Sequence, residues 1–165
     1  MTEQKFLQDL EKKLWKSADT LRSNISAAEY KHIVLGLVFL KYVSDSFETR
    51  RQELILEFTN PKSDYYLCDD INDDIIKEEL ENRDYYTEKN VFWVPQSARW
   101  QYLQDNAGLS LGAKLPDETE FKGIGKFIDD AMHTIEKDNP KLKRILNKNY
   151  AKLHIDPSKL VALVN

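Results

Sequence analysis

Positively charged side chains recur at helical spacing near the C-terminal end of the sequence. Residues 137–159 contain seven bases and two acids, and several of the bases are three or four residues apart. On a helix this spacing places the bases on one face, which would suit the phosphate backbone of a nucleic acid. The alternative is a solvated helix surface with apolar residues beneath it. The candidate DNA contacts are Lys141, Lys143, Arg144, Lys148 and Lys152.

A glycine-containing stretch has the form of a cofactor loop. Glu120-Phe-Lys-Gly123-Ile-Gly125 matches the F-x-G-x-G pattern with which many methyltransferases hold S-adenosylmethionine. Such a loop needs a hydrophobic strand before it and alternating strands and helices after it, whereas residues 111–119 are polar and the remainder has helical periodicity. The catalytic N-P-P-aromatic motif is also missing. We therefore predict no cofactor-binding residue and no catalytic residue in this sequence.

Two groups of acidic residues have spacings found in metal sites. Asp70, Asn72, Asp74 and Glu81 occupy positions one, three, five and twelve of a calcium-binding EF-hand loop, but position six is Ile75, where a sharp turn requires glycine. A solvated acidic helix is the better interpretation.

A second group, Asp129, Asp130 and His133, has the spacing of metal ligands on one helical turn. The other histidines lie in unrelated segments and no H-E-x-x-H motif occurs, so an exposed helical face is favoured. Cys68 has no neighbouring base, which leaves nucleophilic catalysis without support. We predict no metal site.

The element on which these segments must pack is the apolar stretch at residues 26–48. Ser26 and Glu29 form a capping-box start, and apolar residues then cover most of the helix circumference. The pattern continues to about residue 57, before Asn60-Pro61, where proline interrupts a helix. We predict a mainly α-helical bundle around this buried central helix. The predicted core includes Leu14, Trp15, Tyr30, Leu37, Phe39, Leu40, Tyr42, Phe47 and Trp100.

The other predicted elements are mostly short helices. Residues 3–22 form an amphipathic helix that should pack on the central helix after a turn at residues 23–25. An acidic helix is predicted at 73–81, a short strand or hairpin near 90–95, a helix after Pro95, a loop over 108–125 and a helix from 127 to the Asn139-Pro140 pair. A last helix is predicted from Lys141.

Composition indicates one globular domain in a reducing compartment. Of 165 residues 41% are hydrophobic and 32% are charged, and the apolar run at 33–40 is too short for a membrane span. A single cysteine excludes an internal disulfide, and the charged N-terminus does not have the form of a secretory signal, so we expect a cytoplasmic protein. The net charge of −4 is unevenly distributed, since residues 64–88 contain ten acids and two bases. The basic end could face phosphate and the acidic middle could not.

Four ordered motifs resemble the N-terminal helical domain of the modification (methyltransferase) subunit of type I restriction-modification systems. They cover most of the chain, and they are the segments that begin at Leu14-Trp15, at Tyr30 and Leu35-Gly-Leu-Val-Phe-Leu40-Lys41-Tyr42, at Phe92-Trp-Val94-Pro95-Gln-Ser-Ala98-Arg99-Trp100, and at Ile135-Glu136-Lys-Asp-Asn139-Pro140.

The resemblance implies a whole subunit that transfers a methyl group from S-adenosylmethionine to N6 of adenine in DNA. It implies as partners DNA, a specificity subunit, a second modification subunit and a restriction subunit. The catalytic domain would then begin after Asn165, where the sequence ends on an apolar stretch, and residues 1–165 would form one helical domain that is not itself an enzyme. No family motif covers the basic residues, whose assignment rests on charge.

We therefore expect a DNA-facing and subunit-assembly domain. The first alternative is a protein-interaction domain that does not contact DNA, with the acidic middle meeting another subunit. The second is an enzyme complete in itself, which predicts saturable binding of S-adenosylmethionine.

Overall fold

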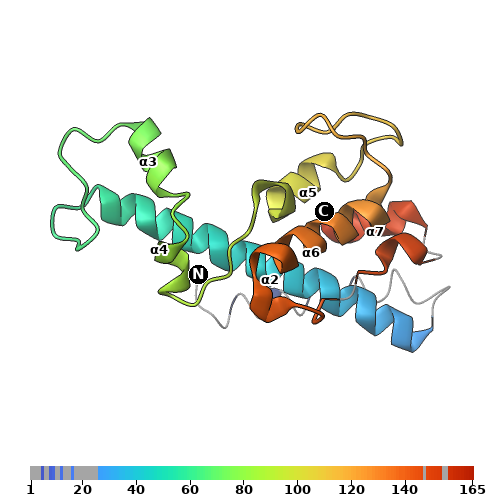
Figure 1. The fold of residues 1–165 in the computed structure, drawn as a ribbon. Coiled ribbons are helices and arrows are strands. Elements are labelled where there is room, and N and C mark those ends of the chain that lie inside the picture. The colour runs from blue at the N-terminus through green and yellow to red at the C-terminus, as the bar shows by residue number, and fades with distance from the viewer. Residues whose placement is uncertain are drawn as a thin grey trace. The chain divides into compact units, whose positions relative to one another are not determined.

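The computed structural model describes residues 26–146, 148–153 and 156–165, together with Lys5, Gln8, Asp9, Lys12 and Lys16. The predicted helix at 3–22 falls mostly outside the described residues, as do Leu14, Trp15 and the side chain of Tyr30. The predicted turn at 23–25 also lies outside them. The fold is mainly helical, as predicted, and the described residues form no extended strand (Figure 1).

The long helix α2 (Ala27–Phe58) confirms the predicted central helix almost to the residue. At its start the backbone N–H of Glu29 donates to Ser26 Oγ at 3.3 Å, as a capping box requires. The Ser26 hydroxyl in turn donates to the Glu29 carboxylate. The helix ends before Asn60-Pro61, where the backbone turns.

The remaining elements are short. They are α3 (Asp73–Glu79), α4 (Asp84–Thr87), η1 (Gln96–Ala98), α5 (Trp100–Asn106), α6 (Ile124–Asp138), η2 (Pro140–Leu142), η3 (Tyr150–Lys152) and α7 (Pro157–Val164). The acidic helix, the helix after Pro95 and the helix before Asn139 are therefore confirmed. No described helix is both long and apolar enough to cross a bilayer.

The chain divides into two compact units. Unit 1 contains Met1–Lys41 and Pro95–Asn165, and unit 2 contains Tyr42–Val94. Helix α2 contributes its first part to unit 1 and its second part to unit 2. The single domain predicted for residues 1–165 stays a prediction.

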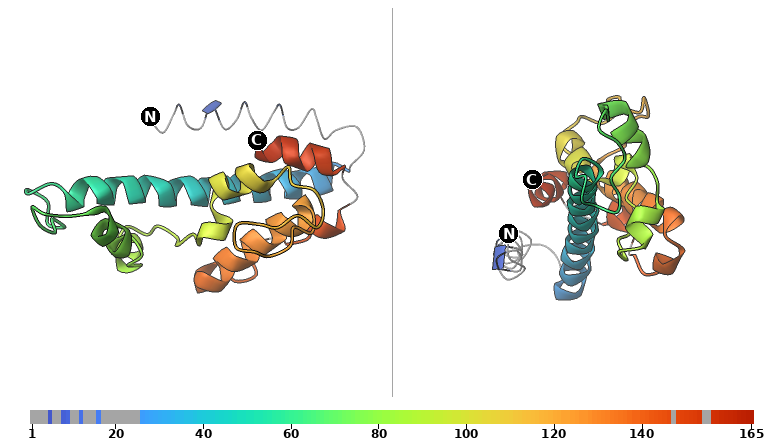
Figure 2. Two further views of the ribbon diagram at one scale, coloured as in Figure 1. Left: turned by 90° about the horizontal axis from the view of Figure 1, so that it is seen from above. Right: turned by 90° about the vertical axis from the view of Figure 1, so that its left-hand side faces the viewer.

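Unit 1 is built on α6, which packs against α7 and the short helices η1, η2 and η3 (Figure 2). Its apolar residues recur at helical spacing, so one face of α6 is buried while the other is solvated. From α2 the buried side chains Ile33, Leu37 and Leu40 complete this core. Trp100 is also buried, and the Lys41 ammonium lies 5.6 Å from the centre of its ring.

Tyr150 connects α2 with α6 inside unit 1. Its hydroxyl donates to the backbone oxygen of Ile33 at 2.7 Å, and burial raises the pKa of this phenol. The ring fits because Gly36 has no side chain, since a Cβ there would lie 2.1 Å from the Tyr150 hydroxyl oxygen. A Cβ at Gly125 on α6 would lie 2.7 Å from the Tyr150 backbone oxygen. Two glycines from different helices thus make the space that Tyr150 occupies.

Unit 2 contains an aromatic cluster and a buried arginine. Phe47 stacks on Tyr86 at a centroid distance of 4.8 Å, and Trp93 meets both rings edge to face. Arg50 is 2% exposed and its Nε donates to the Tyr85 backbone oxygen at 3.1 Å. This hydrogen bond offsets part of the cost of burying the charged side chain of Arg50.

The prediction of a short strand or hairpin near residues 90–95 is wrong. Residues 91–95 have no regular secondary structure, and the backbone N–H of Val91 donates to Tyr86 at 2.9 Å instead of to a second strand. The β-branched and aromatic residues that suggested a strand serve the core, since Trp93 and Val94 are buried in unit 2.

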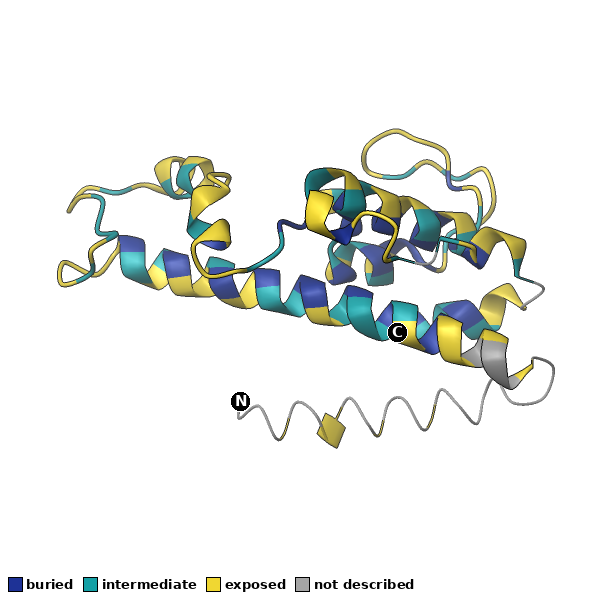
Figure 3. Cartoon of the chain, turned by 60° about the horizontal axis from the view of Figure 1, so that its bottom comes forward, coloured by how far each residue is buried: buried dark blue, intermediate teal, exposed yellow. Residues whose placement is uncertain are grey.

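Helix α2 is not covered on every side (Figure 3). Of its predicted core residues, Leu37, Leu40 and Phe47 are buried, Phe39 is half-buried and Tyr42 is 53% exposed. The assignment of Tyr42 to the core is therefore wrong. Tyr42 lies seven residues after Leu35, which is 64% exposed, and therefore on the same side of the helix. The apolar sequence around the whole helix concealed this difference between its sides.

The Tyr150 contact predicts an unusual response to substitution of Gly36. Alanine is normally favoured over glycine in a helix by about 1 kcal/mol. Here we expect Gly36→Ala to lower the free energy of unfolding by about 1–3 kcal/mol, because the added methyl overpacks the site. Urea unfolding measures this change. Gly108→Ala is the control, since nothing lies within 4 Å of a Cβ there. Stabilisation by Gly36→Ala would contradict the contact.

Candidate nucleic-acid interface

The basic segment after α6 is not a helix. The structure has the short 3₁₀ helix η2 at Pro140–Leu142, a turn over residues 143–145, a bend at 146 and a second 3₁₀ helix, η3, at Tyr150–Lys152. The prediction that Lys141, Arg144, Lys148 and Lys152 share one helical face is therefore wrong. Helical spacing was present, but Leu142 and Tyr150 are buried by packing on the rest of unit 1 while Ile145 is 65% exposed.

Asp129 fastens the end of this segment to α6. Its two carboxylate oxygens accept hydrogen bonds from the backbone N–H groups of Tyr150 and Ala151, each at 2.9 Å. These amides begin η3, so Asp129 satisfies donors that a short helix cannot pair internally. The spacing of Asp129, Asp130 and His133 is found in metal sites, although the sequence favoured an exposed helical face. In the structure Asp129 serves the backbone, and no metal-binding group of three or more ligands occurs among the described residues.

Glu136 fastens the middle of the segment. Lys148 Nζ lies 2.7 Å from Glu136 Oε1, and the two side chains are 30% and 12% exposed. This hydrogen bond, with the charge of Lys148 and the nearby backbone amide of Arg144, holds the pKa of Glu136 below its ordinary value despite partial burial. Lys148 is therefore a structural partner of α6 in this conformation.

The other candidate contacts lie on the surface of unit 1. They are exposed and make no ion pair with any described residue, and Lys137 in the last turn of α6 is exposed as well. Exposed lysine and arginine side chains keep their full hydration and are available to an anionic polymer. The exposed candidates are Lys141, Lys143, Arg144 and Lys152.

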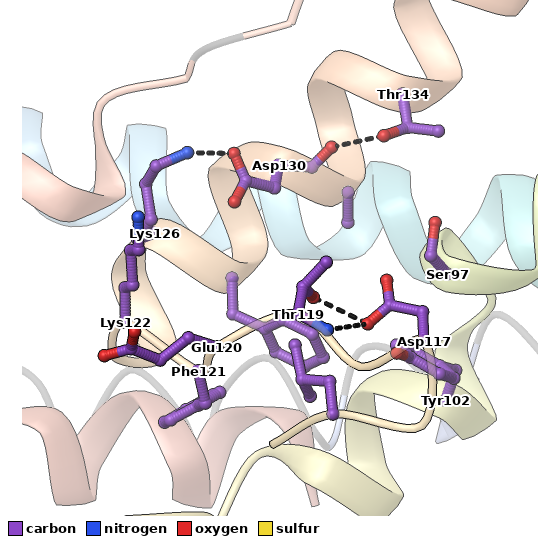
Figure 4. A pocket seen from close by; sticks show the side chains of 13 residues that line it. Ser97, Tyr102, Asp117, Thr119, Glu120, Phe121, Lys122, Lys126, Asp130 and Thr134 are labelled. Atoms are coloured by element: carbon purple, nitrogen blue, oxygen red, sulfur yellow. Dashed lines mark hydrogen bonds and ion pairs between the residues drawn. The ribbon is translucent and has the colours of Figure 1, made fainter. Parts of the chain in front are cut away.

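A separate pocket of about 530 Å³ opens between α5, α6 and the loop at residues 115–122 (Figure 4). Asp117 accepts hydrogen bonds from the backbone and hydroxyl of Thr119, which lower the pKa of its carboxyl. Lys126 pairs with Asp130 on α6. The Tyr102 hydroxyl is buried and has no hydrogen-bond partner in the described part of the chain, and burial raises its pKa.

The pocket does not have the form of a nucleotide site. Phe121 and Lys122 line it, but Gly123 and Gly125 do not. Gly123 precedes α6 with φ at 102°, a left-handed conformation that favours glycine, and Gly125 admits Tyr150. Both glycines of the F-x-G-x-G match therefore have structural roles. The absence of a cofactor site stays a prediction.

The acidic middle of the sequence forms an exposed surface on unit 2. Asn72 caps α3 by accepting hydrogen bonds from the backbone N–H groups of Asp74 and Ile75, which is the geometry of a helix start. This confirms the acidic helix. Cys68 is free and exposed. The acids of the 64–88 segment are exposed except for Glu79, which is half-buried and accepts a hydrogen bond from Tyr85.

Several residues that position the basic segment had no signal in the sequence. Glu136 lies in one of the four motifs that resemble the family, but no sequence pattern indicated that it pairs with Lys148. Tyr150 lies in the segment predicted to be the last helix, and its partner Ile33 is more than a hundred residues away. Pairings over such separations leave no local pattern.

These features define a helical module with a basic turn segment on one unit and an acidic surface on the other. Residues 10–165 match the family model described as the HsdM N-terminal domain, and the chain belongs to this family.

The chain is also similar to two curated proteins. It is 33% identical over 158 residues to a protein of Methanocaldococcus jannaschii named type I restriction enzyme MjaIX methylase subunit, covering 95% of this chain and 26% of that protein. It is 53% identical over 55 residues to the type I restriction enzyme HindI methylase subunit of Haemophilus influenzae, covering 33% of this chain and 12% of that protein. The chain thus spans about a quarter or less of the length of these relatives. The resemblance to an N-terminal domain of a type I methylase subunit is confirmed.

The lowered pKa of Glu136 predicts a pH-dependent contribution to stability. At pH 7 we expect Glu136→Gln to lower the free energy of unfolding by about 0.5–1 kcal/mol, because the pair with Lys148 is removed. The pair is fully formed above the ordinary glutamate pKa, and its contribution disappears as the pH falls through the lower folded pKa.

Urea unfolding of wild type and Glu136→Gln at pH 7 and pH 3 should therefore show a difference at pH 7 that shrinks at pH 3. Glu78→Gln on the exposed surface of α3 is the control and should show little difference at either pH. If the difference in unfolding free energy between wild type and Glu136→Gln grew on acidification, the pKa of Glu136 would not be lowered in the folded state.

Proposed function

We propose that this chain is a DNA-facing and subunit-assembly module of a type I restriction-modification methylase subunit. The observation that carries the proposal is the separation of charge between the two units. Exposed bases lie on unit 1 in and around the turn at residues 142–145, whereas exposed acids of residues 64–88 lie on unit 2. A phosphate backbone attracts the first surface and repels the second.

In this proposal the whole protein methylates adenine N6 in DNA with S-adenosylmethionine. The cofactor and the reaction belong to a part of the subunit other than these 165 residues. The roles of the two glycines in the F-x-G-x-G match support a non-catalytic role here, because Gly123 precedes α6 and Gly125 gives space to Tyr150. A flat calorimetric trace for S-adenosylmethionine with this chain is the expected result.

The acidic surface of unit 2 suits a protein partner. Apolar area accompanies the charge there, since Leu56 on α2 is 70% exposed and Ile75 on α3 is 40% exposed. We propose that this surface contacts one of the other subunits, which would be the specificity subunit, a second modification subunit or the restriction subunit. The competing function, a protein-interaction module that does not bind DNA, rests on the same surface.

Reversing exposed charge on unit 1 should separate these functions. We expect the triple variant Lys141→Glu, Lys143→Glu, Lys152→Glu to bind duplex DNA much more weakly than wild type. Its slope of log affinity against log salt should be shallower by roughly 0.9 for each phosphate that the variant no longer neutralises. Fluorescence anisotropy with a labelled duplex over a range of salt concentrations measures both quantities.

The matched control reverses three exposed lysines of unit 2, with the same change in net charge: Lys62→Glu, Lys77→Glu, Lys89→Glu. This variant should keep most of its affinity and its salt slope. Wild-type protein that does not bind duplex even at low salt would favour the protein-interaction function. Equal weakening in the two triple variants would mean that net charge alone controls binding.

A further inference from the structure

The turn at residues 142–145 has an arginine where its backbone favours glycine. The backbone N–H of Ile145 donates to the Leu142 oxygen at 3.0 Å, and Lys143 has φ −55° and ψ 124°. Arg144 follows with φ at 66°. These values define a type II β-turn, whose third position requires positive φ and is usually glycine or asparagine. An arginine here is held in a conformation that costs conformational energy.

The residues on each side of this turn hold it in place. Leu142, its first residue, is buried, and Lys148 after the turn is paired with Glu136 on α6. The Arg144 backbone amide also lies near the Glu136 carboxylate and contributes to its lowered pKa. Tyr150 and Asp129 then fix the chain further on. The turn is thus anchored at both ends, which allows the unfavourable backbone conformation to persist.

The tip of the turn combines two charges with an apolar side chain. Lys143 and Arg144 are exposed, and 65% of the surface of Ile145 is exposed. The element is a single turn, so it is neither the helix nor the two-stranded ribbon that fits a major groove. Arginines and apolar side chains such as isoleucine are the residues that proteins insert into the narrower minor groove.

We propose that the Leu142–Ile145 turn enters the minor groove of duplex DNA, with Arg144 inside the groove, Ile145 against the sugars and base edges, and Lys143 on phosphate. This inference rests on the proposed function and specifies how unit 1 meets DNA. The left-handed backbone of Arg144 costs stability, and its side chain is exposed.

The test is a substitution that removes the arginine side chain while favouring the positive-φ backbone conformation of the turn. Arg144→Gly should raise the melting temperature, because glycine adopts positive φ without strain. It should lower affinity for an A·T-rich duplex by roughly tenfold at fixed salt, and by less for a G·C-rich duplex, because narrow A·T-rich minor grooves attract arginine more strongly. Glu118→Gly is the matched control, since Glu118 is exposed and has the same φ of 66°. It should raise the melting temperature without weakening DNA binding.

Two further measurements locate the turn on the duplex. Netropsin, which occupies A·T-rich minor grooves, should reduce wild-type affinity to the level of Arg144→Gly and have little effect on that variant. Ile145→Ser should weaken binding without changing the salt slope, because no charge is removed. Both results would support insertion into the groove.

The outcomes distinguish this inference from the proposed function. If wild type binds DNA and the Lys141, Lys143, Lys152 triple variant is weakened while Arg144→Gly binds normally, the groove inference is overturned and the proposed function survives. Equal weakening of Arg144→Gly on both duplexes with no netropsin competition would make Arg144 a phosphate contact, which also overturns groove insertion. Wild type that does not bind DNA would overturn both.

Discussion

Unit 1 depends on Tyr150, whose ring occupies space left free by Gly36 and whose backbone lies close against Gly125. Tyr150 lies where side chains at Gly36 and Gly125 would be, and its hydroxyl donates to the backbone of α2 at Ile33. This hydrogen bond offsets the cost of burying the phenol hydroxyl. Because Tyr150 also begins η3, the same interaction fixes the path of the chain after α6. The basic segment is positioned by this packing and not by a helix of its own.

Anchoring gives the basic segment a defined conformation at a cost. Glu136 and Asp129 on α6 each use a carboxylate to hold a part of the segment, one through Lys148 and the other through backbone amides. Before these two contacts the chain makes a tight turn with an arginine at positive φ. Unfavourable backbone conformations persist where surrounding contacts fix them, and they concentrate at functional positions. Asp129, one of the acids with metal-ligand spacing in the sequence, is thus part of the support for a basic surface.

The two units differ in the kind of surface they present. Unit 2 encloses an aromatic cluster and the buried Arg50, and its outside is strongly acidic. Unit 1 presents exposed lysines and arginine around an anchored turn. Like charge repels the acidic surface of unit 2 from phosphate, whereas the exposed bases of unit 1 attract it. The pocket beside α5 contains the buried Tyr102 hydroxyl, which no described residue pairs, but its lining mixes both signs of charge and indicates no particular ligand.

The sequence by itself determined the elements whose signals are local. Ser26 and Glu29 marked the start of α2, Asn60-Pro61 its end and Asn139-Pro140 the end of α6, because caps and prolines act within a few residues. Ordered motifs also gave the family, which the comparisons confirm. Only the tertiary structure decided which side of α2 is exposed at Tyr42. It also decided that Trp93 and Val94 belong to a core and form no strand. The segment after Asn139 turns in the structure, where its spacing predicted a helix. The physical reason is that burial of Leu142 and Tyr150 against helices distant in sequence outweighs a weak local propensity.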